Sequence, residues 1–151
     1  MYVRPATADD RAALPTLHTA AVREFGPKSY DAEAVRQWAK ACGRSPEDYE
    51  TPPDEHFTVA LREDAVAGFG HVVPAVGEVH AVYVHPDHTR CGVGSTLLAE
   101  LEGFARGLGL PSLSLQSSLN AVGFYEMAGY ERVDESESPG GLRVMEMEKV
   151  L

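Results

Sequence analysis

The sequence predicts an α/β (α+β) fold, in which a mixed, mainly antiparallel central sheet of about six or seven strands is flanked by helices. Three apolar runs between residues 56 and 84 are joined by tight turns, which is typical of an antiparallel meander. The segments on both sides of this meander carry apolar residues at helical spacing instead. The chain has 151 residues, so we expect residues 1–151 to form one domain.

The N-terminal third of the chain is predicted to contain one strand and several helices. Residues 2–4 resemble a short first strand. A helix with apolar residues at helical spacing follows and is broken at Gly26. Asp31 is suited to cap a second helix that ends at Gly43, and Ser45 is suited to cap a short helical turn.

The rest of the chain alternates between segments with the helical spacing of apolar residues and segments typical of strands. An amphipathic helix is predicted between Gly94 and Gly109, because leucines recur there on one face. The other elements predicted along this part of the chain are strands at 56–61, 65–73, 78–84 and 113–116, a helix at 121–128, and a closing β-pair at 130–133 and 142–147.

Charge and cysteine content exclude several classes of protein. The chain carries 13 Lys and Arg against 23 Asp and Glu, a net charge of −10, which argues against a nucleic-acid binder and against docking on an anionic membrane by charge. Cys42 and Cys91 are too few for a disulfide framework. No apolar run approaches the roughly 18–20 residues that span a bilayer. We therefore expect a cytoplasmic protein.

A glycine-containing loop before the amphipathic helix is the strongest candidate for a binding site. It reads Thr89-Arg90-Cys91-Gly92-Val93-Gly94-Ser95. Glycines at a helix start let backbone N–H groups converge on an anion such as a pyrophosphate. A tight turn without any ligand explains the spacing equally well. Neither a Walker loop nor a complete dinucleotide fingerprint is present, since Leu97 occupies the place of a third glycine.

A second candidate lies where the strand at 113–116 gives way to the next helix. Ser117, Ser118 and Asn120 are suited to cap that helix, and Tyr125 places an aromatic hydroxyl in its second turn. Taken alone, this pattern is more often a helix cap followed by a core tyrosine.

Together the two segments resemble the GCN5-related N-acetyltransferase (GNAT) superfamily, and in particular its small single-domain prokaryotic members. The matching text is EVHAVYVHPDHTRCGVGSTLL from Glu78 and SLNAVGFYEMAGY from Ser118. The order of the other elements also agrees, so the resemblance covers essentially the whole chain. Thr89 stands where the family usually has Gln or Arg, and Ser118 where it usually has Asn.

The resemblance implies a site for acetyl-CoA. The strand end at 82–84 would pair with the pantetheine arm, one of its amides would polarise the thioester carbonyl, and the glycine loop would bind the pyrophosphate. Tyr125 matches the tyrosine that protonates the departing thiolate, and Glu78 matches the position of a general base. The residues that the resemblance assigns to the cofactor are Val82, Tyr83, Val84, Thr89, Arg90, Cys91, Gly92, Val93, Gly94, Ser95 and Asn120.

We therefore expect an acetyl-CoA-dependent N-acetyltransferase that acts by direct transfer to a primary amine of a small molecule or protein. Acetyl-CoA would be a co-substrate, and no nucleic acid or membrane would be involved. His80 is an alternative base, two residues after Glu78. A CoA-binding sensor or partner module without catalysis is the competing hypothesis.

Two further features of the sequence bear on metal binding and on dimerisation. His85, His88 and Cys91 are zinc-ligand types at regular spacing, but they straddle the glycine loop and have no second ligand pair, so we expect no metal. The closing strands 130–133 and 142–147 could offer an edge to a second copy, which makes a homodimer possible.

Overall fold

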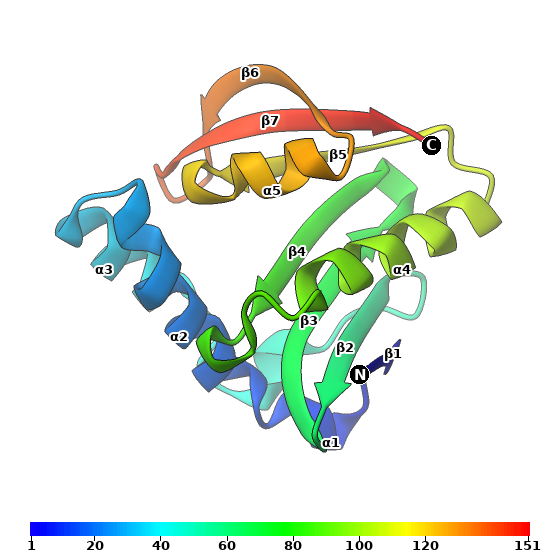
Figure 1. Ribbon diagram of the computed structural model, residues 1–151, viewed down its shortest axis with the longest axis horizontal. Helices are drawn as coiled ribbons and strands as arrows, with labels where there is room; N and C mark the ends of the chain where they lie inside the picture. Colours follow the sequence, from blue (N-terminus) through cyan, green and yellow to red (C-terminus); the bar gives the residue numbers. More distant parts are fainter.

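A single seven-stranded sheet forms the centre of the protein. The computed structural model describes all residues 1–151. The strands lie in the order β1-β2-β3-β4-β5-β7-β6, and every neighbouring pair is antiparallel except the parallel pair β4–β5 (Figure 1). Their bounds are β1 Tyr2–Pro5, β2 His56–Arg62, β3 Ala65–Val73, β4 Glu78–Val84, β5 Ser112–Ser118, β6 Glu131–Glu137 and β7 Arg143–Val150. The predicted mixed, mainly antiparallel sheet is confirmed.

Five α-helices flank the sheet: α1 Ala8–Arg11, α2 Leu14–Phe25, α3 Ala32–Ala41, α4 Val93–Gly107 and α5 Val122–Met127. The structure splits the single helix that we predicted before Gly26 into α1 and α2. Pro15 explains the break, because proline has no N–H to continue the helical ladder from Arg11. Asp31 caps α3 as predicted, since its Oδ1 accepts a 2.8 Å hydrogen bond from the Ala34 N–H.

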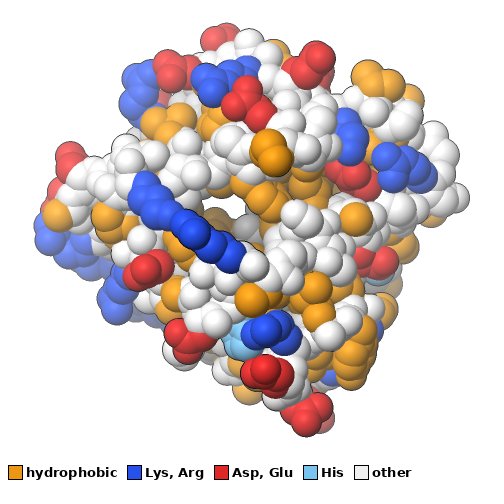
Figure 2. Space-filling view, in the orientation of Figure 1, with side chains coloured by type: hydrophobic (Ala, Val, Ile, Leu, Met, Phe, Trp, Pro, Cys, Tyr) orange, Lys and Arg blue, Asp and Glu red, His pale blue; other side chains and the backbone are white.

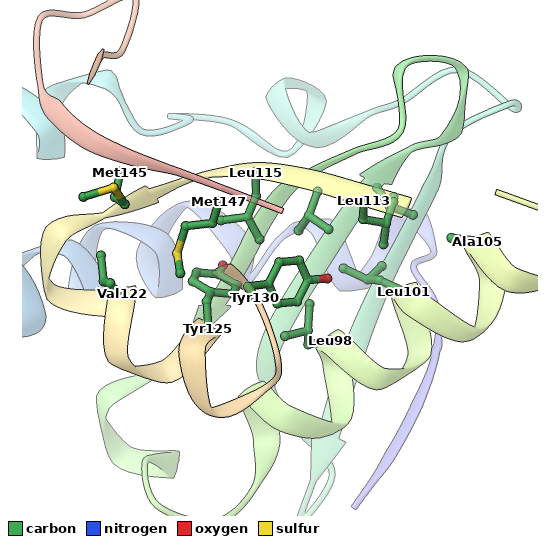
Figure 3. Packing of buried hydrophobic residues seen from close by; sticks show 12 residues of the cluster. Leu98, Leu101, Ala105, Leu113, Leu115, Val122, Tyr125, Tyr130, Met145 and Met147 are labelled. Carbon is green, nitrogen blue, oxygen red and sulfur yellow. The ribbon is translucent and has the colours of Figure 1, made fainter. Parts of the chain in front are cut away.

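The two faces of the sheet are covered differently. Helix α4 packs on one face of the N-terminal strands, and α2 packs on the other (Figure 1). Helix α5 lies beside β5 and β6, on the same side as α4 (Figure 1). In the largest core cluster, Tyr125 and Tyr130 lie between the leucines of α4 and the side chains of β5 and β7 (Figure 3). This core therefore fixes α5 against α4 and the C-terminal strands.

One buried carboxylate joins α4 to the C-terminal strand pair. Glu102 of α4 accepts a 2.9 Å hydrogen bond from the Tyr130 hydroxyl and a 2.9 Å bond from Lys149 Nζ. Lys149 also donates to the Ala128 carbonyl at 2.8 Å. A charge that is buried without partners is costly, and here both oxygens of the carboxylate are satisfied.

The sheet opens between its two parallel strands. β4 and β5 pair only at Glu78↔Ser114 and Val79↔Leu115, although each strand has seven residues. On its other side, β4 has a bulge at His80, since Val79 and Ala81 face the consecutive residues Val72 and His71 of β3. A bulge bends its strand and leaves one residue out of the ladder. The ends of β4 and β5 therefore stand apart, and their backbone groups are free to face a ligand.

The edges of the sheet are β1 and β6. We predicted that both closing strands offer an edge to a second copy, but β7 lies between β5 and β6, so this is wrong for β7. β6 is longer than predicted and almost wholly exposed. It carries Glu131, Asp134, Glu135 and Glu137, and charge on an edge strand disfavours pairing with another edge. None of the helices is long and apolar enough to cross a membrane.

Candidate active site

A cavity of about 340 Å³ lies where the sheet opens. Figure 2 shows a hollow near the middle of this face, ringed by hydrophobic side chains and crossed at its mouth by Lys and Arg side chains. The cavity is bounded by the end of β4, the loop before α4, the start of α5 and the end of α2. We call it the cofactor cleft. Its lining residues include Phe25, Lys28, Trp38, Val82, Tyr83, Val84, Thr89, Arg90, Gly92, Val93, Gly94, Ser95, Ser118, Asn120 and Phe124.

The N-terminus of α4 points its free amides into this cleft. Gly92 is the N-cap with φ +78°, and Arg90 has φ +59°, so the loop turns through two left-handed residues just before the helix. The first amides of a helix have no partner within it and carry its positive dipole end. A Cβ on Gly94 would lie 3.1 Å from the Phe124 ring, so a glycine at this position lets the Phe124 side chain pack close to the loop. The exposed cations Lys28 and Arg90 add positive charge.

Asn120 supplies an unpaired acceptor. Its Oδ1 is buried and has no hydrogen-bond partner within the protein, and the residue lines the cofactor cleft. An unpaired buried polar atom costs about 1–3 kcal/mol, and a donor on a bound molecule would relieve that cost. The cleft thus combines an anion cradle with a free acceptor, which suits a ligand that has a pyrophosphate and amide N–H groups.

The residues that the family resemblance assigned to the cofactor can be compared with the lining of this cleft. All of the positions that it assigned line the cofactor cleft except Cys91. The Cys91 thiol is exposed and donates to the Thr89 carbonyl at 3.3 Å. Ser118, which we noted as a cap candidate and as a departure from the family pattern, lines the cleft as well.

A second cavity of about 260 Å³ lies next to the cofactor cleft. The two cavities share Trp38, Val82, Tyr83, Ser118 and Ala121, so they adjoin where β4 and β5 part. We call the second one the acceptor cavity. Its other lining residues are Ala41, Val79, His80, Ala81, Gln116, Ser117, Tyr125, Ser138, Gly140, Leu142 and Val144.

Tyr125 lines the acceptor cavity from α5. Its ring packs edge-on against Phe124 at 5.0 Å and Tyr130 at 5.7 Å between centroids. Burial raises the pKa of the Tyr125 phenol above its usual value of about 10. The phenol is therefore protonated at neutral pH, as a proton donor must be.

Glu78 and His80 lie at the base of β4 but are not equivalent. His80 lines the acceptor cavity, whereas Glu78 lines neither cavity. His80 Nε2 lies 3.2 Å from Glu78 Oε2, so the two side chains share one face as the sequence suggested. The His80 ring also lies 5.3 Å from that of His71, whose Nε2 is 2.7 Å from Glu55 Oε1. Burial lowers the pKa of His71.

Tyr30 and Trp38 support the two cavities from the segment around α3. The Tyr30 hydroxyl donates to the Arg143 carbonyl at 2.5 Å and accepts from the Leu119 N–H at 2.9 Å, which ties the segment before α3 to the C-terminal strands. No local pattern could reveal partners so far along the chain. Trp38 lines both cavities.

His18 of α2 was not predicted. Its Nδ1 lies 2.9 Å from the Tyr49 hydroxyl, and its ring is 4.2 Å from that of Tyr83. Burial lowers the pKa of His18 to about 4, so this imidazole is neutral at pH 7.

The histidines near the glycine loop form no metal cluster. The rings of His85 and His88 are 6.0 Å apart, and His85 Nδ1 accepts a 3.0 Å hydrogen bond from the Asp87 N–H. No group of three His, Cys, Asp or Glu side chains anywhere in the structure is arranged to hold a metal ion.

Comparison with known proteins identifies the family to which this chain belongs. Residues 27–151 match the family model of the acetyltransferase (GNAT) domain. The chain therefore belongs to the GNAT acetyltransferase family, as the resemblance predicted. No curated protein matches the sequence.

Several solved structures share the fold over nearly the whole chain. A GCN5-related N-acetyltransferase from Rhodopseudomonas palustris, also titled aminotransferase class-II, is 25% identical with a TM-score of 0.90, covering 99% of this chain and 95% of that one. The PaiA N-acetyltransferase of Thermoplasma acidophilum, solved with coenzyme A, is 21% identical with a TM-score of 0.73, covering 99% and 98%. A ribosomal-protein-alanine N-acetyltransferase from Brucella melitensis is 25% identical with a TM-score of 0.67 and covers both chains fully.

Proposed function

We propose that this protein transfers an acetyl group from acetyl-CoA directly to a primary amine. The observation that carries the proposal is the pair of adjoining cavities, one with an anion cradle and one with a protonated tyrosine, which share Val82 and Tyr83. Such an arrangement holds two reactants in one complex, and positioning of this kind removes much of a bimolecular barrier. A similar fold with bound coenzyme A supports the identity of the cofactor.

Acetyl-CoA would lie across the opening of the sheet. The amides at the start of α4 would bind the pyrophosphate, with Lys28 and Arg90 adding charge. The pantetheine arm would run along the end of β4 at residues 82–84, which β5 leaves unpaired, and Asn120 Oδ1 would accept one of its amide N–H groups. This places the thioester between the two cavities.

The chemistry follows from the groups around that point. The amine nitrogen forms the new N–C bond, and the C–S bond of the thioester breaks. The amine's proton passes to the pair formed by His80 and Glu78, because His80 faces the cavity and Glu78 lies 3.2 Å behind it. Backbone amides at the end of β4 stabilise the oxyanion. Tyr125 donates its proton to the departing sulfur. Because a thiol with an intrinsic pKa of about 8.5 is a stronger acid than this phenol, the transfer is uphill, and the tyrosinate then regains a proton from solvent.

Residues 1–151 would act as one N-acetyltransferase domain without a metal ion. Titration calorimetry with acetyl-CoA, followed by a free-CoA release assay over a panel of amines, tests the proposal. We expect one acetyl-CoA bound per chain and release of CoA with at least one amine. Binding without release on any amine would favour a CoA-binding sensor or partner module, and failure to bind acetyl-CoA would contradict both functions.

A further inference from the structure

The acceptor cavity has an apolar lining without any formal charge at pH 7 when His80 is neutral. Ten of its sixteen lining residues are hydrophobic, among them Trp38 and Ala41 of α3, Val79 and Ala81 of β4, and the residues Leu142 and Val144. Its polar side chains are those of His80, Gln116, Tyr83, Tyr125 and three serines. No Asp, Glu, Lys or Arg is part of the lining, although Asp and Glu together number 23 in the chain.

Two carboxylates neighbour lining residues of the cavity, and neither is part of the lining itself. Glu78 contacts His80 and does not line the cavity. Glu146 faces Gln116 in the β5–β7 register, and Gln116 lines the cavity whereas Glu146 does not. A second ammonium group inside the cavity would therefore lose its water without gaining an ionic partner. Such desolvation costs several kcal/mol for a charged group.

An apolar part of a substrate would be stabilised by burial against the same hydrophobic side chains. Each buried CH₂ contributes about 0.8 kcal/mol of transfer free energy. Trp38 is also held in place, because its ring packs edge-on against Tyr30 at 5.7 Å and the Tyr30 hydroxyl is hydrogen-bonded to the backbone of Arg143 and Leu119. Because these side chains are already ordered before binding, less conformational entropy is lost when the substrate binds.

We propose that the acceptor is a primary amine carried on an apolar body with no second positive charge, and that Trp38, Leu142 and Val144 select it. This inference rests on the proposed acetyl transfer. A polyamine or another polycation is disfavoured by the cavity itself, since it would place an unpaired ammonium beside Leu142 and Val144.

The test compares hexylamine with 1,6-diaminohexane, which have the same length and differ by one ammonium group. We expect kcat/KM for hexylamine to exceed that for the diamine by at least about 100-fold. Leu142→Glu introduces a carboxylate into the wall and should narrow this ratio by about tenfold, while the matched control Leu142→Gln should not. Leu142 is half-buried, and the hydrogen bonds of its turn come from its backbone, so both variants keep the loop.

The outcomes separate the inference from the proposed function. The inference would be overturned if kcat/KM of the unaltered protein for the diamine equals or exceeds that for hexylamine. It would also be overturned if Leu142→Glu leaves the ratio of the two kcat/KM values unchanged. If no amine releases CoA, the proposed acetyl transfer is refuted. Amine binding to the CoA-loaded protein then tests the inference about the acceptor by itself. Trp38 is the only tryptophan of the chain, so its fluorescence in the CoA-loaded protein reports amine binding. Tighter binding of hexylamine would support the inference, and equal binding would contradict it.

Discussion

Replacing Tyr30 by Phe removes one oxygen atom that joins two distant parts of the chain. The hydroxyl donates to the Arg143 carbonyl at 2.5 Å and accepts from the Leu119 N–H at 2.9 Å, and neither partner belongs to the helical segment that carries Tyr30. A hydrogen bond contributes about 0.5–1.5 kcal/mol net. The two together therefore stabilise the fold by about 1–3 kcal/mol.

For a chain of this length, 1 kcal/mol corresponds to about 2–4 °C in Tm. We expect Tyr30→Phe to lower Tm by about 2–12 °C in scanning calorimetry, and to raise KM for the amine because Trp38 loses its support. Tyr125→Phe is the matched control, because burial alone accounts for the raised pKa of that phenol and no bridging hydrogen bond is lost. A Tyr30→Phe protein with the Tm of the unaltered protein would refute the reasoning.

Three further predictions follow from the structure. Burial lowers the pKa of His18 to about 4 from 6.5, so the unfolded chain takes up this proton first as the pH falls. The fold then loses no stability through His18 above pH 6.5 and loses about 3 kcal/mol by pH 4. Urea unfolding at pH 7 and pH 5 should show about 2 kcal/mol of this loss, and His18→Gln should reduce it. Asn120→Ala should weaken acetyl-CoA binding about tenfold in calorimetry without lowering Tm, since Oδ1 has no partner in the protein; unaltered affinity would remove Asn120 from the site. Glu78→Gln should change the pH dependence of kcat/KM, because Glu78 lies 3.2 Å from His80, and an unaltered profile would exclude the pair as the base.

The parts of the fold that depend on local pattern could be predicted. The glycine loop and α4 follow from adjacent residues, because a left-handed Gly92 and an apolar helical face are both local features. The same holds for the meander from β2 to β4 and for the Asp31 cap of α3. The break between α1 and α2 was predictable in principle from Pro15, and the prediction overlooked it.

The parts that depend on distant contacts could not be predicted. The separation of β4 from β5 reflects a two-residue pairing, and no sequence period encodes where a ladder stops. The placing of β7 inside the sheet, rather than at its edge, depends on its pairing with β5. The difference between Glu78 and His80, of which only His80 lines the cavity, likewise depends on what packs around β4 and not on local sequence.

We propose that the opening between β4 and β5 brings acetyl-CoA and an amine together, with Tyr125 as the proton donor. Single-turnover acetyl transfer by Tyr125→Phe, measured together with its Kd for acetyl-CoA, tests this role of Tyr125. Tyr125 lines the acceptor cavity and not the cofactor cleft, so we predict a rate lowered by about 100-fold or more and a Kd within about twofold of the unaltered protein. A full rate in this variant would contradict the account.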